Sequence, residues 1–550
     1  MAADLPVPIF TKLEEAHPDP VIATRESGRW NELANAFQSR FGHPPTYIAR
    51  APGRVNIIGE HIDYALFGVF PAAVDQDILI ACGPSTSTGA HDAYTRTSGQ
   101  VRAHNLHPKY GSQTFAPVLK TENGKDAWYL EIDKTQLRWE SYVKAGYYGV
   151  LNRFFDPTNK SEQAPVPVDL LFTGTVPAGS GLSSSAAMVV ASTLAFLACN
   201  NKLVGIKKGE LVELAVENER RVGVNSGGMD QAASVISLPL SALFINFFPL
   251  LNAEPIPLPF ARTARRGAFV VANSLVVADK VVSAKWHYNL RVVETLVGAR
   301  ILAHLLAPAH PALVGLLKDV ERPTFREVLG AYLGVRETKG KADNALTVEQ
   351  LKAGLEKLLV ETEKLQGPAL RGEKAGELGL TMDEMVKFSG LSQPEFHRIY
   401  LSWVDVEAKY FEIYRRAKHV FSEALRVISY RDVCLRVAGS DPLPESVLTE
   451  LGALMNASQD SCNKLFDCSC PELNSLTQIC RDAGAYGSRL TGAGWGGCTI
   501  SLVPEDDVEN FIKKVKAAYP PFRDLEGEKL HEAIFATRPA SGAFVFKLEA

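Results

Sequence analysis

The stretch Gly179-Ser-Gly-Leu-Ser-Ser-Ser-Ala-Ala187 joins a strand-like segment, Asp169–Thr173, to a helix-like segment, Ser184–Leu197. The helix-like segment is apolar along nearly its whole length, which predicts burial on most of its sides. Small residues let a backbone approach a ligand closely, and the unpaired N–H groups at a helix start attract phosphate. The stretch therefore predicts a phosphate-binding turn within a mixed α and β fold. A turn needed only for tight packing is the alternative.

This turn is not a P-loop, because the pattern G-x-x-x-x-G-K-[ST] occurs nowhere in the chain. A second glycine-rich stretch, Gly492-Ala-Gly-Trp-Gly-Gly497, fits the G-x-G-x-x-G pattern of dinucleotide sites. A strand pattern at residues 498–503 follows it in place of a helix, so no helix dipole is available for a pyrophosphate. We interpret the second stretch as the entry to a strand that packs against another loop.

A third stretch, Gly223-Val-Asn-Ser-Gly-Gly-Met-Asp-Gln231, places Asp230 beside glycines after a helical pattern at residues 213–222. A carboxylate in such a place can orient or deprotonate a hydroxyl group of a ligand. The alternative is that Asp230 only caps the helix that follows it.

A fourth stretch, Gly53-Arg-Val-Asn-Ile-Ile-Gly-Glu-His-Ile-Asp-Tyr64, gathers ionisable side chains beside an apolar strand. These side chains are Arg54, Glu60, His61 and Asp63. Carboxylates and an imidazole in one loop suit the binding of several sugar hydroxyls, since each hydroxyl both donates and accepts. A solvated loop with incidental charges is the alternative.

The second half of the chain opens after the Pro-rich passage Pro249–Pro259, which we interpret as the connection between two halves. A strand pattern follows at Ala268–Ala272, and a helix is expected to begin near His287. Residues 306–380 are polar and helical in pattern, and they resemble an inserted helical hairpin.

Length and composition exclude several classes of protein. The chain has 550 residues, which suggests about two to four domains, and its formal charge of −4 argues against a strongly basic nucleic-acid surface. Its most apolar segments, such as Met188–Cys199, are too short to span a bilayer, and its first 15 residues make a poor signal peptide. We therefore expect a soluble, cytoplasmic protein with no nucleic-acid or membrane partner. Its eight cysteines are expected to be reduced, structural thiols.

Taken in their order along the chain, the four stretches resemble the GHMP small-molecule kinases, and within them the galactokinases. Pro52–Tyr64 is similar to the galactokinase sugar motif, Val176–Ala186 to the phosphate loop, and Ser488–Gly497 to the C-terminal glycine motif. Further matches are Trp139–Gly146, Tyr288–Arg291 and Cys470–Leu473. The similarity spans roughly residues 45 to 505, and the long insertion after residue 305 resembles that of fungal members.

The resemblance implies roles for the matched positions. Asp230 would be the catalytic base or orienting carboxylate for the sugar C1 hydroxyl, and Arg54 would neutralise charge near the γ-phosphoryl group. The residues implied to hold the sugar are Arg54, Glu60, His61, Asp63, Gly227, Asp230 and Tyr288. Those implied to contact ATP are Gly179, Gly181, Ser183, Ser185, Asp279 and Lys280. Ser185 and Glu219 are the candidate Mg²⁺ ligands, with Glu217 as an alternative to Glu219 because the helix register is open.

The resemblance also implies an α+β fold of two GHMP kinase domains, with the active site in the cleft between them. The N-terminal domain would span residues 41–250 after an N-terminal extension at 1–40. The C-terminal domain would span 251–550 and contain the helical insertion at about 306–380. The bounds of the phosphate loop and the sugar motif place both in the N-terminal domain.

The implied reaction transfers a phosphoryl group from ATP to the C1 hydroxyl of D-galactose, giving galactose 1-phosphate and ADP. One rival is an N-acetylgalactosamine kinase, since such relatives carry similar motifs. Another is a transcriptional sensor that binds galactose and ATP and then engages a regulatory protein, as some fungal relatives do. Such sensors can lack a Ser-Ala pair in the phosphate loop, whereas Ser184-Ser-Ala-Ala187 is intact here. A regulatory protein partner remains an expectation of the fungal resemblance.

Overall fold

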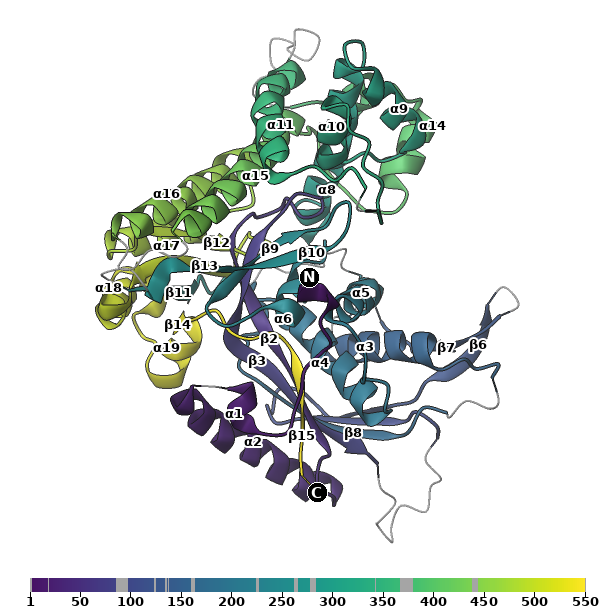
Figure 1. The fold of residues 1–550 in the computed structure, drawn as a ribbon, viewed down its shortest axis with the longest axis vertical. Coiled ribbons are helices and arrows are strands. Elements are labelled where there is room, and N and C mark those ends of the chain that lie inside the picture. The colour runs from purple at the N-terminus through teal and green to yellow at the C-terminus, as the bar shows by residue number, and fades with distance from the viewer. Residues whose placement is uncertain are drawn as a thin grey trace.

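The computed structural model describes residues 2–549 apart from 18, 86–96, 123–124, 134–135, 137, 160–163, 224–226, 262–265, 277–282, 342, 367–378 and 438–443. Two larger β-sheets with helices packed on them form the body of the molecule, and a group of helices extends from it at the top of Figure 1. No helix in the described part of the chain is both long and apolar enough to cross a membrane.

The larger sheet carries the strand that precedes the stretch Gly179–Ala187 and the strand that contains the beginning of the stretch Gly53–Tyr64. Its seven strands run in the order β1-β15-β2-β3-β8-β4-β5. They are β1 (Ile9–Phe10), β15 (Phe544–Lys547), β2 (Tyr47–Ile58), β3 (Phe70–Pro84), β8 (Val168–Gly174), β4 (Val101–Asn105) and β5 (Gln113–Phe115). Strands β2 and β3 pair antiparallel, and their register shifts twice between Pro52 and Ile58. Such irregularities bend a strand, here within the stretch Gly53–Tyr64.

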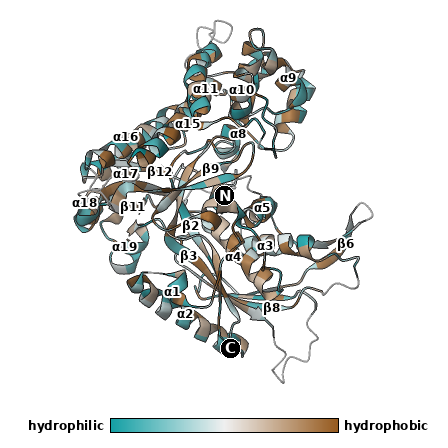
Figure 2. Ribbon diagram, in the orientation of Figure 1, coloured by the Kyte–Doolittle hydropathy of each residue, from teal (hydrophilic) through white to brown (hydrophobic). Residues whose placement is uncertain are grey.

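Helices cover both faces of this sheet, as Figure 1 shows. One face carries α3 (Trp139–Phe154), α4 (Ser184–Cys199), α5 (Lys208–Glu219) and α6 (Met229–Ile236). The other face is covered by α1 (Leu13–Ala16) and α2 (Pro20–Phe41), whose Trp30, Leu33 and Phe37 pack on it. Figure 2 shows hydrophobic residues gathered on the sheet and on α4, which is buried along most of its length. Hydrophobic burial on both faces therefore fixes the sheet on which the site is built.

The second sheet has four antiparallel strands in the order β12-β13-β11-β14. They are β12 (Gly487–Thr491), β13 (Cys498–Pro504), β11 (Gly267–Asn273) and β14 (Ile534–Thr537). The helices that accompany this part of the chain are α16 (Ser446–Ser461), α17 (Pro471–Asp482), α18 (Val508–Ala518) and α19 (Gly527–Ala533). Two further hairpins complete the strands: β9 (Ser241–Asn246) with β10 (Asn252–Pro257), and β6 (Val118–Glu122) with β7 (Lys125–Tyr129).

The remaining helices form the group at the top of Figure 1. They are α8 (Tyr288–Leu306), α9 (Pro311–Asp319), α10 (Phe325–Tyr332), α11 (Val348–Glu361), α13 (Met382–Ser389), α14 (Gln393–Phe396) and α15 (Ile413–Arg436). Helix α8 begins where the sequence predicts, directly after His287. The described residues of the 306–380 segment are helical as expected, but they form several short helices packed on α8 and α15, so the expected hairpin is wrong.

Other expectations meet the structure with different results. The strand at 169–173 and the helix at 184–197 are confirmed as β8 and α4. Most of Pro249–Pro259, interpreted as the connection between two halves, is itself a strand, because residues 252–257 pair with β9 as strand β10. Strand β15, expected in the second domain, lies in the first sheet between β1 and β2. All eight cysteines are free thiols, and all but Cys470 are buried.

Candidate active site

A cavity of about 120 Å³ lies where elements from both halves of the chain meet. Its walls come from β2 and the loop after it, from the start of α6, from the start of α8, and from the loop between β12 and β13. The lining residues are Arg54, Glu60, His61, Asp63, Gly223, Met229, Asp230, Ser283, Ala284, His287, Tyr288, Asn289, Gly492, Ala493, Gly494 and Trp495. Six of the seven side chains and glycines expected to hold a sugar are in this set, and the seventh, Gly227, contacts one of them.

Arg54 connects the carboxylate of Asp230 to the phosphate-binding turn. Its Nε and Nη2 lie 2.7 and 2.6 Å from Oδ1 of Asp230, and its Nη1 donates to the carbonyl oxygen of Gly181 at 2.6 Å. The Asp230 side chain is 24% exposed, whereas that of Arg54 is 5% exposed. A partly exposed carboxylate therefore faces the cavity, held by an arginine whose other end touches the turn expected to bind phosphate.

Asp63 is a second carboxylate of the cavity, and its environment differs from that of Asp230. Burial, followed by the nearby negative charge of Asp230, raises the pKa of Asp63 to about 7. Gly227 lies directly against it, because a Cβ added at position 227 would stand 2.1 Å from Oδ2 of Asp63. Only glycine allows this approach. Asp63 is therefore a carboxylate held close to Gly227 and to Asp230, with a pKa raised chiefly by burial.

We predict that Asp63→Asn stabilises the ligand-free protein at alkaline pH. The folded-state pKa of Asp63 lies above the ordinary value of 3.8, so the stability present at low pH is lost as the pH rises through about 7. Asparagine removes this ionisation. Its melting temperature should exceed that of the wild type by at least about 2 °C at pH 8, and the difference should close towards pH 4. Thermal unfolding at several pH values measures this, with the exposed Asp405→Asn as control. Equal melting temperatures of Asp63→Asn and wild type from pH 5 to 8 would show the assignment to be wrong.

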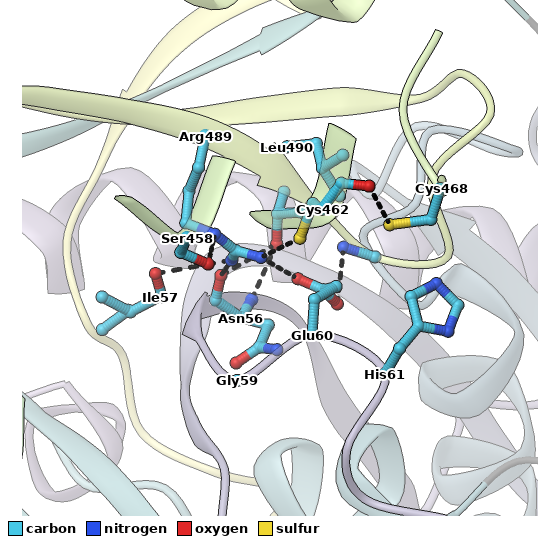
Figure 3. Close-up of polar contacts among 12 residues, drawn as sticks. Asn56, Ile57, Gly59, Glu60, His61, Ser458, Cys462, Cys468, Arg489 and Leu490 are labelled. Carbon is cyan, nitrogen blue, oxygen red and sulfur yellow. Dashed lines mark hydrogen bonds and ion pairs between the residues drawn. The ribbon is translucent and has the colours of Figure 1, made fainter. Parts of the chain in front are cut away.

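Each carboxylate oxygen of Glu60 accepts one hydrogen bond from a residue of the second half. Its Oε2 accepts a hydrogen bond from Nη2 of Arg489 at 2.8 Å, and its Oε1 accepts one from the backbone N–H of Gly492 at 3.2 Å. Figure 3 shows the two side chains meeting between β12 and the loop after β2. Sequence reasoning missed Arg489. An arginine inside the buried strand Gly487–Thr491 was the available signal, since a buried charge requires a partner.

His61 lines the cavity, but both of its ring nitrogens have protein partners. Nε2 donates to the carbonyl oxygen of Ala493 at 2.8 Å, so Nδ1 is left to accept from the hydroxyl of Tyr64 at 3.1 Å. Burial lowers the pKa of His61 to about 3, which keeps the ring neutral. The ring therefore serves as a fixed wall of the cavity in this structure.

Aromatic residues form much of the remaining wall. The ring of Tyr288 lies 5.6 Å from that of His61, and the ring of Trp495 stacks on His287 at 4.7 Å with an interplanar angle of 10°. Trp495 and His287 were not predicted as site residues. Aromatic surfaces beside a few polar groups are typical of small-molecule sites. The cavity thus combines apolar faces with several hydrogen-bonding groups.

The phosphate-binding turn has the expected position between β8 and α4. Gly179, Gly181 and Ser183 take positive φ angles of 73°, 82° and 59°. The interpretation of residues 492–497 as a strand entry packed against another loop is confirmed. A Cβ at Gly492 would stand 2.6 Å from the carbonyl oxygen of Gly181, and one at Gly497 would stand 2.9 Å from that of Ser180. Glycine is required here because two backbones touch.

Polar groups in this turn, at the start of α4 and at the end of α5 are the candidates for phosphate or metal ligands. The buried hydroxyl of Ser183 has no hydrogen-bond partner among the described residues, and Ser185 lies half-buried in the first turn of α4. At the end of α5, Glu219 is buried and accepts from Nε2 of Gln231 at 2.5 Å, whereas Glu217 is exposed. The helix register therefore favours Glu219 over Glu217 as the candidate Mg²⁺ ligand. Asp279 and Lys280, the remaining expected ATP contacts, lie outside the described residues.

Comparison with known proteins gives consistent matches along the chain. The galactokinase galactose-binding signature matches residues 35–84, the GHMP kinase N-terminal domain matches 142–237, and the GHMP kinase C-terminal domain matches 442–521. The galactokinase of Saccharomyces cerevisiae is 35% identical over 98% of each chain, and that of Dictyostelium discoideum is 35% identical over 94% of each. A crystal structure of Lactococcus lactis galactokinase complexed with galactose covers 94% of this chain and 99% of its own, with 22% identity and a TM-score of 0.56.

The fold and the arrangement of the cavity beside the glycine-rich turn define a GHMP-type small-molecule kinase. The two-domain α+β class expected from the sequence is thereby confirmed. With the sequence identity to the curated relatives at full length, the chain belongs to the galactokinase family.

Proposed function

We propose that the chain transfers the γ-phosphoryl group of ATP to the anomeric C1 hydroxyl of D-galactose. The observation that carries the proposal is the continuous contact from Asp230 through Arg54 to Gly181. It links a carboxylate facing the cavity to the turn expected to hold the phosphates. A sugar in the cavity would therefore place a hydroxyl between its proton acceptor and the phosphoryl donor.

In the proposed step, the C1 hydroxyl gives its proton to the carboxylate of Asp230 as its oxygen bonds to the γ-phosphorus. The bond from the γ-phosphorus to the bridging oxygen breaks, and ADP leaves with that electron pair. Phosphoryl transfer depends mainly on positioning and on neutralisation of charge, with little covalent chemistry from the protein. Arg54 supplies positive charge at the point where the acid and the turn meet, which suits this demand.

The proposal assigns Mg²⁺ to Ser185 and Glu219. A hydroxyl and a carboxylate are hard oxygen ligands, which Mg²⁺ prefers, and the phosphates would complete its coordination. When bound, the ion would neutralise phosphate charge. Ser183, with its unpartnered buried hydroxyl, would donate to a phosphate oxygen, as would the N–H groups at the start of α4.

The remaining expectations belong to the same proposal. A division near residue 250 stays a prediction for the bulk of the chain, since the cavity is lined from both sides of it, but β1, α2 and β15 lie with the first sheet although the predicted bounds leave them out of its domain. ATP and galactose are the small-molecule partners that family membership supports. A cytoplasmic location, the nucleotide contacts of Asp279 and Lys280, and a regulatory protein partner stay predictions.

The test is ADP release by purified protein with MgATP, comparing D-galactose, N-acetylgalactosamine and D-glucose. We expect turnover with galactose to exceed turnover with the other two sugars by at least about tenfold. A preference for N-acetylgalactosamine would replace the proposed substrate. Saturable galactose binding without ADP release would replace the kinase with a sensor.

A further inference from the structure

Arg489, on strand β12, is the largest fully buried side chain in the described part of the molecule, and every one of its donors has an acceptor. A guanidinium carries five N–H donors. Its Nε donates to the Ser458 hydroxyl at 3.1 Å, Nη1 to the carbonyl oxygens of Asn56 and Ile57 at 2.8 and 3.4 Å, and Nη2 to Oε2 of Glu60 at 2.8 Å and to the sulfur of Cys462 at 3.8 Å.

Three of these five acceptors belong to the segment 56–60, as Figure 3 shows. This segment contains the end of β2 and Glu60, which lines the cavity. Other residues of the second half hold the same segment. Glu423 on α15 accepts from the N–H of Gly59 at 2.9 Å, and it also accepts from the hydroxyl of Ser458 at 2.6 Å. His419, on the same helix, lies 3.0 Å from the carbonyl oxygen of Glu60 through its Nε2.

We infer that Arg489 is a positioning residue of the sugar site: it fixes the carboxylate of Glu60 and the backbone before it, so that Glu60 can accept a sugar hydroxyl. The inference rests on the proposed function. With Oε2 held by Arg489 and Oε1 by Gly492, the Glu60 carboxylate has one defined orientation at the cavity wall. Carboxylates keep unused lone pairs after two such bonds, and these can accept a hydroxyl.

Without Arg489, Glu60 would be a buried carboxylate lacking its cation. Burial already raises the pKa of Glu60, and the charge of Arg489 is the largest influence that opposes this rise. An uncompensated buried carboxylate takes up a proton or moves. Either change would alter the acceptor offered to the sugar, although Arg489 itself is not among the residues that line the cavity.

Arg489→Lys is the conservative variant that separates this role from charge alone. A lysine retains the positive charge but has three donors on one nitrogen, so it cannot replace the donors that three separate nitrogens of Arg489 give to Ser458, to the backbone at 56–57 and to Glu60. We expect galactose affinity, measured by calorimetry, to fall at least about tenfold. Affinity for a non-hydrolysable MgATP analogue should stay within about twofold of the wild type.

The matched control is Arg326→Lys. Arg326 is nearly as buried as Arg489 and pairs with the buried Glu337 at 2.5 and 2.7 Å, but it lies outside the cavity lining. It should lose stability to a similar extent while keeping galactose affinity within about twofold. Equal losses of galactose affinity in the two variants would overturn the inference in favour of general destabilisation.

A panel of monodeoxygalactoses gives a readout that a purely structural role would not move. In the wild type, the analogue that lacks the hydroxyl donating a hydrogen bond to Glu60 should bind more weakly than galactose. In Arg489→Lys this difference in affinity should shrink to less than about twofold. Adding Glu60→Gln to Arg489→Lys should reduce galactose affinity little further. Two results would overturn the inference. One is an affinity difference between galactose and this analogue that is as large in Arg489→Lys as in the wild type; the other is losses of galactose affinity from Arg489→Lys and Glu60→Gln that add in the double variant.

The outcome also separates this inference from the proposed function. Because the readout is binding, a wild type that binds galactose without phosphorylating it would refute only the proposed reaction. An Arg489→Lys variant with wild-type galactose affinity, in a protein that phosphorylates galactose, would refute only the positioning role. A wild type that does not bind galactose would refute both.

Discussion

Replacing Asp230 with asparagine should reduce the kcat for galactose phosphorylation by about 10³-fold while galactose affinity stays within several-fold of the wild type. Proton transfer by a positioned base contributes roughly 10²- to 10⁴-fold to rate. Asparagine preserves the shape and one oxygen, so Arg54 can still donate to Oδ1, but the amide cannot take up the proton of the C1 hydroxyl. Steady-state turnover and calorimetric galactose binding measure the two quantities separately.

Asp75→Asn is the control for this substitution, because Asp75 is a half-buried aspartate on β3 that does not line the cavity. Its kcat should remain within about twofold of the wild type. Near-normal turnover in Asp230→Asn would contradict the role of Asp230 as a base. A loss of galactose affinity as large as the loss of kcat would instead make it a residue needed chiefly for binding.

Arg54→Lys should lower kcat by about 10²- to 10³-fold and leave the protein folded. An arginine that stabilises transferring phosphoryl charge can contribute 10³- to 10⁵-fold, and a lysine retains part of that charge. The lysine cannot bond to Asp230 and to the carbonyl oxygen of Gly181 at the same time, so the link between acid and turn is broken. Single-turnover kinetics at saturating galactose and MgATP measure the chemical step directly.

Arg50→Lys on the same strand is the matched control. Arg50 is buried to a similar degree and donates to Asp77 at 2.6 Å, but it does not line the cavity. We expect its single-turnover rate to stay within about twofold of the wild type. If Arg50→Lys and Arg54→Lys slow the reaction equally, the effect of Arg54 comes from the strand and not from its contact with Asp230.

Local patterns were sufficient to predict the parts of the fold whose information lies within short segments. The apolar run Ser184–Leu197 and the glycines before it predict a buried helix behind a tight turn, and α4 has this form. The clustering of Arg54, Glu60, His61 and Asp63 beside an apolar strand predicts one polar site, and all four line the same cavity, with Arg54 on β2 and the others in the loop after it. Such features can be predicted because the backbone conformation of a turn and the chemistry of a binding motif depend on residues close together in the sequence.

Contacts between distant segments were not predictable in the same way. The pairing of β15 with β2 joins residues almost 500 positions apart, and no periodicity within either strand encodes it. The same holds for the ion pair of Arg489 and Glu60, because the segment around each residue shows one charge and does not show which distant residue pairs with it. The motif that contains His61 predicts it as a sugar ligand, whereas its partners Ala493 and Tyr64 depend on the folded chain.

The most direct test of the account is to identify the product formed from MgATP and galactose labelled with ¹³C at C1. Phosphorus NMR should show a sugar phosphate whose signal is split by coupling to the labelled carbon, and it should appear with wild-type protein but about 10³-fold more slowly with Asp230→Asn. A phosphate on any other hydroxyl, or no sugar phosphate at all, would contradict the placement of the C1 hydroxyl between Asp230 and the phosphate-binding turn.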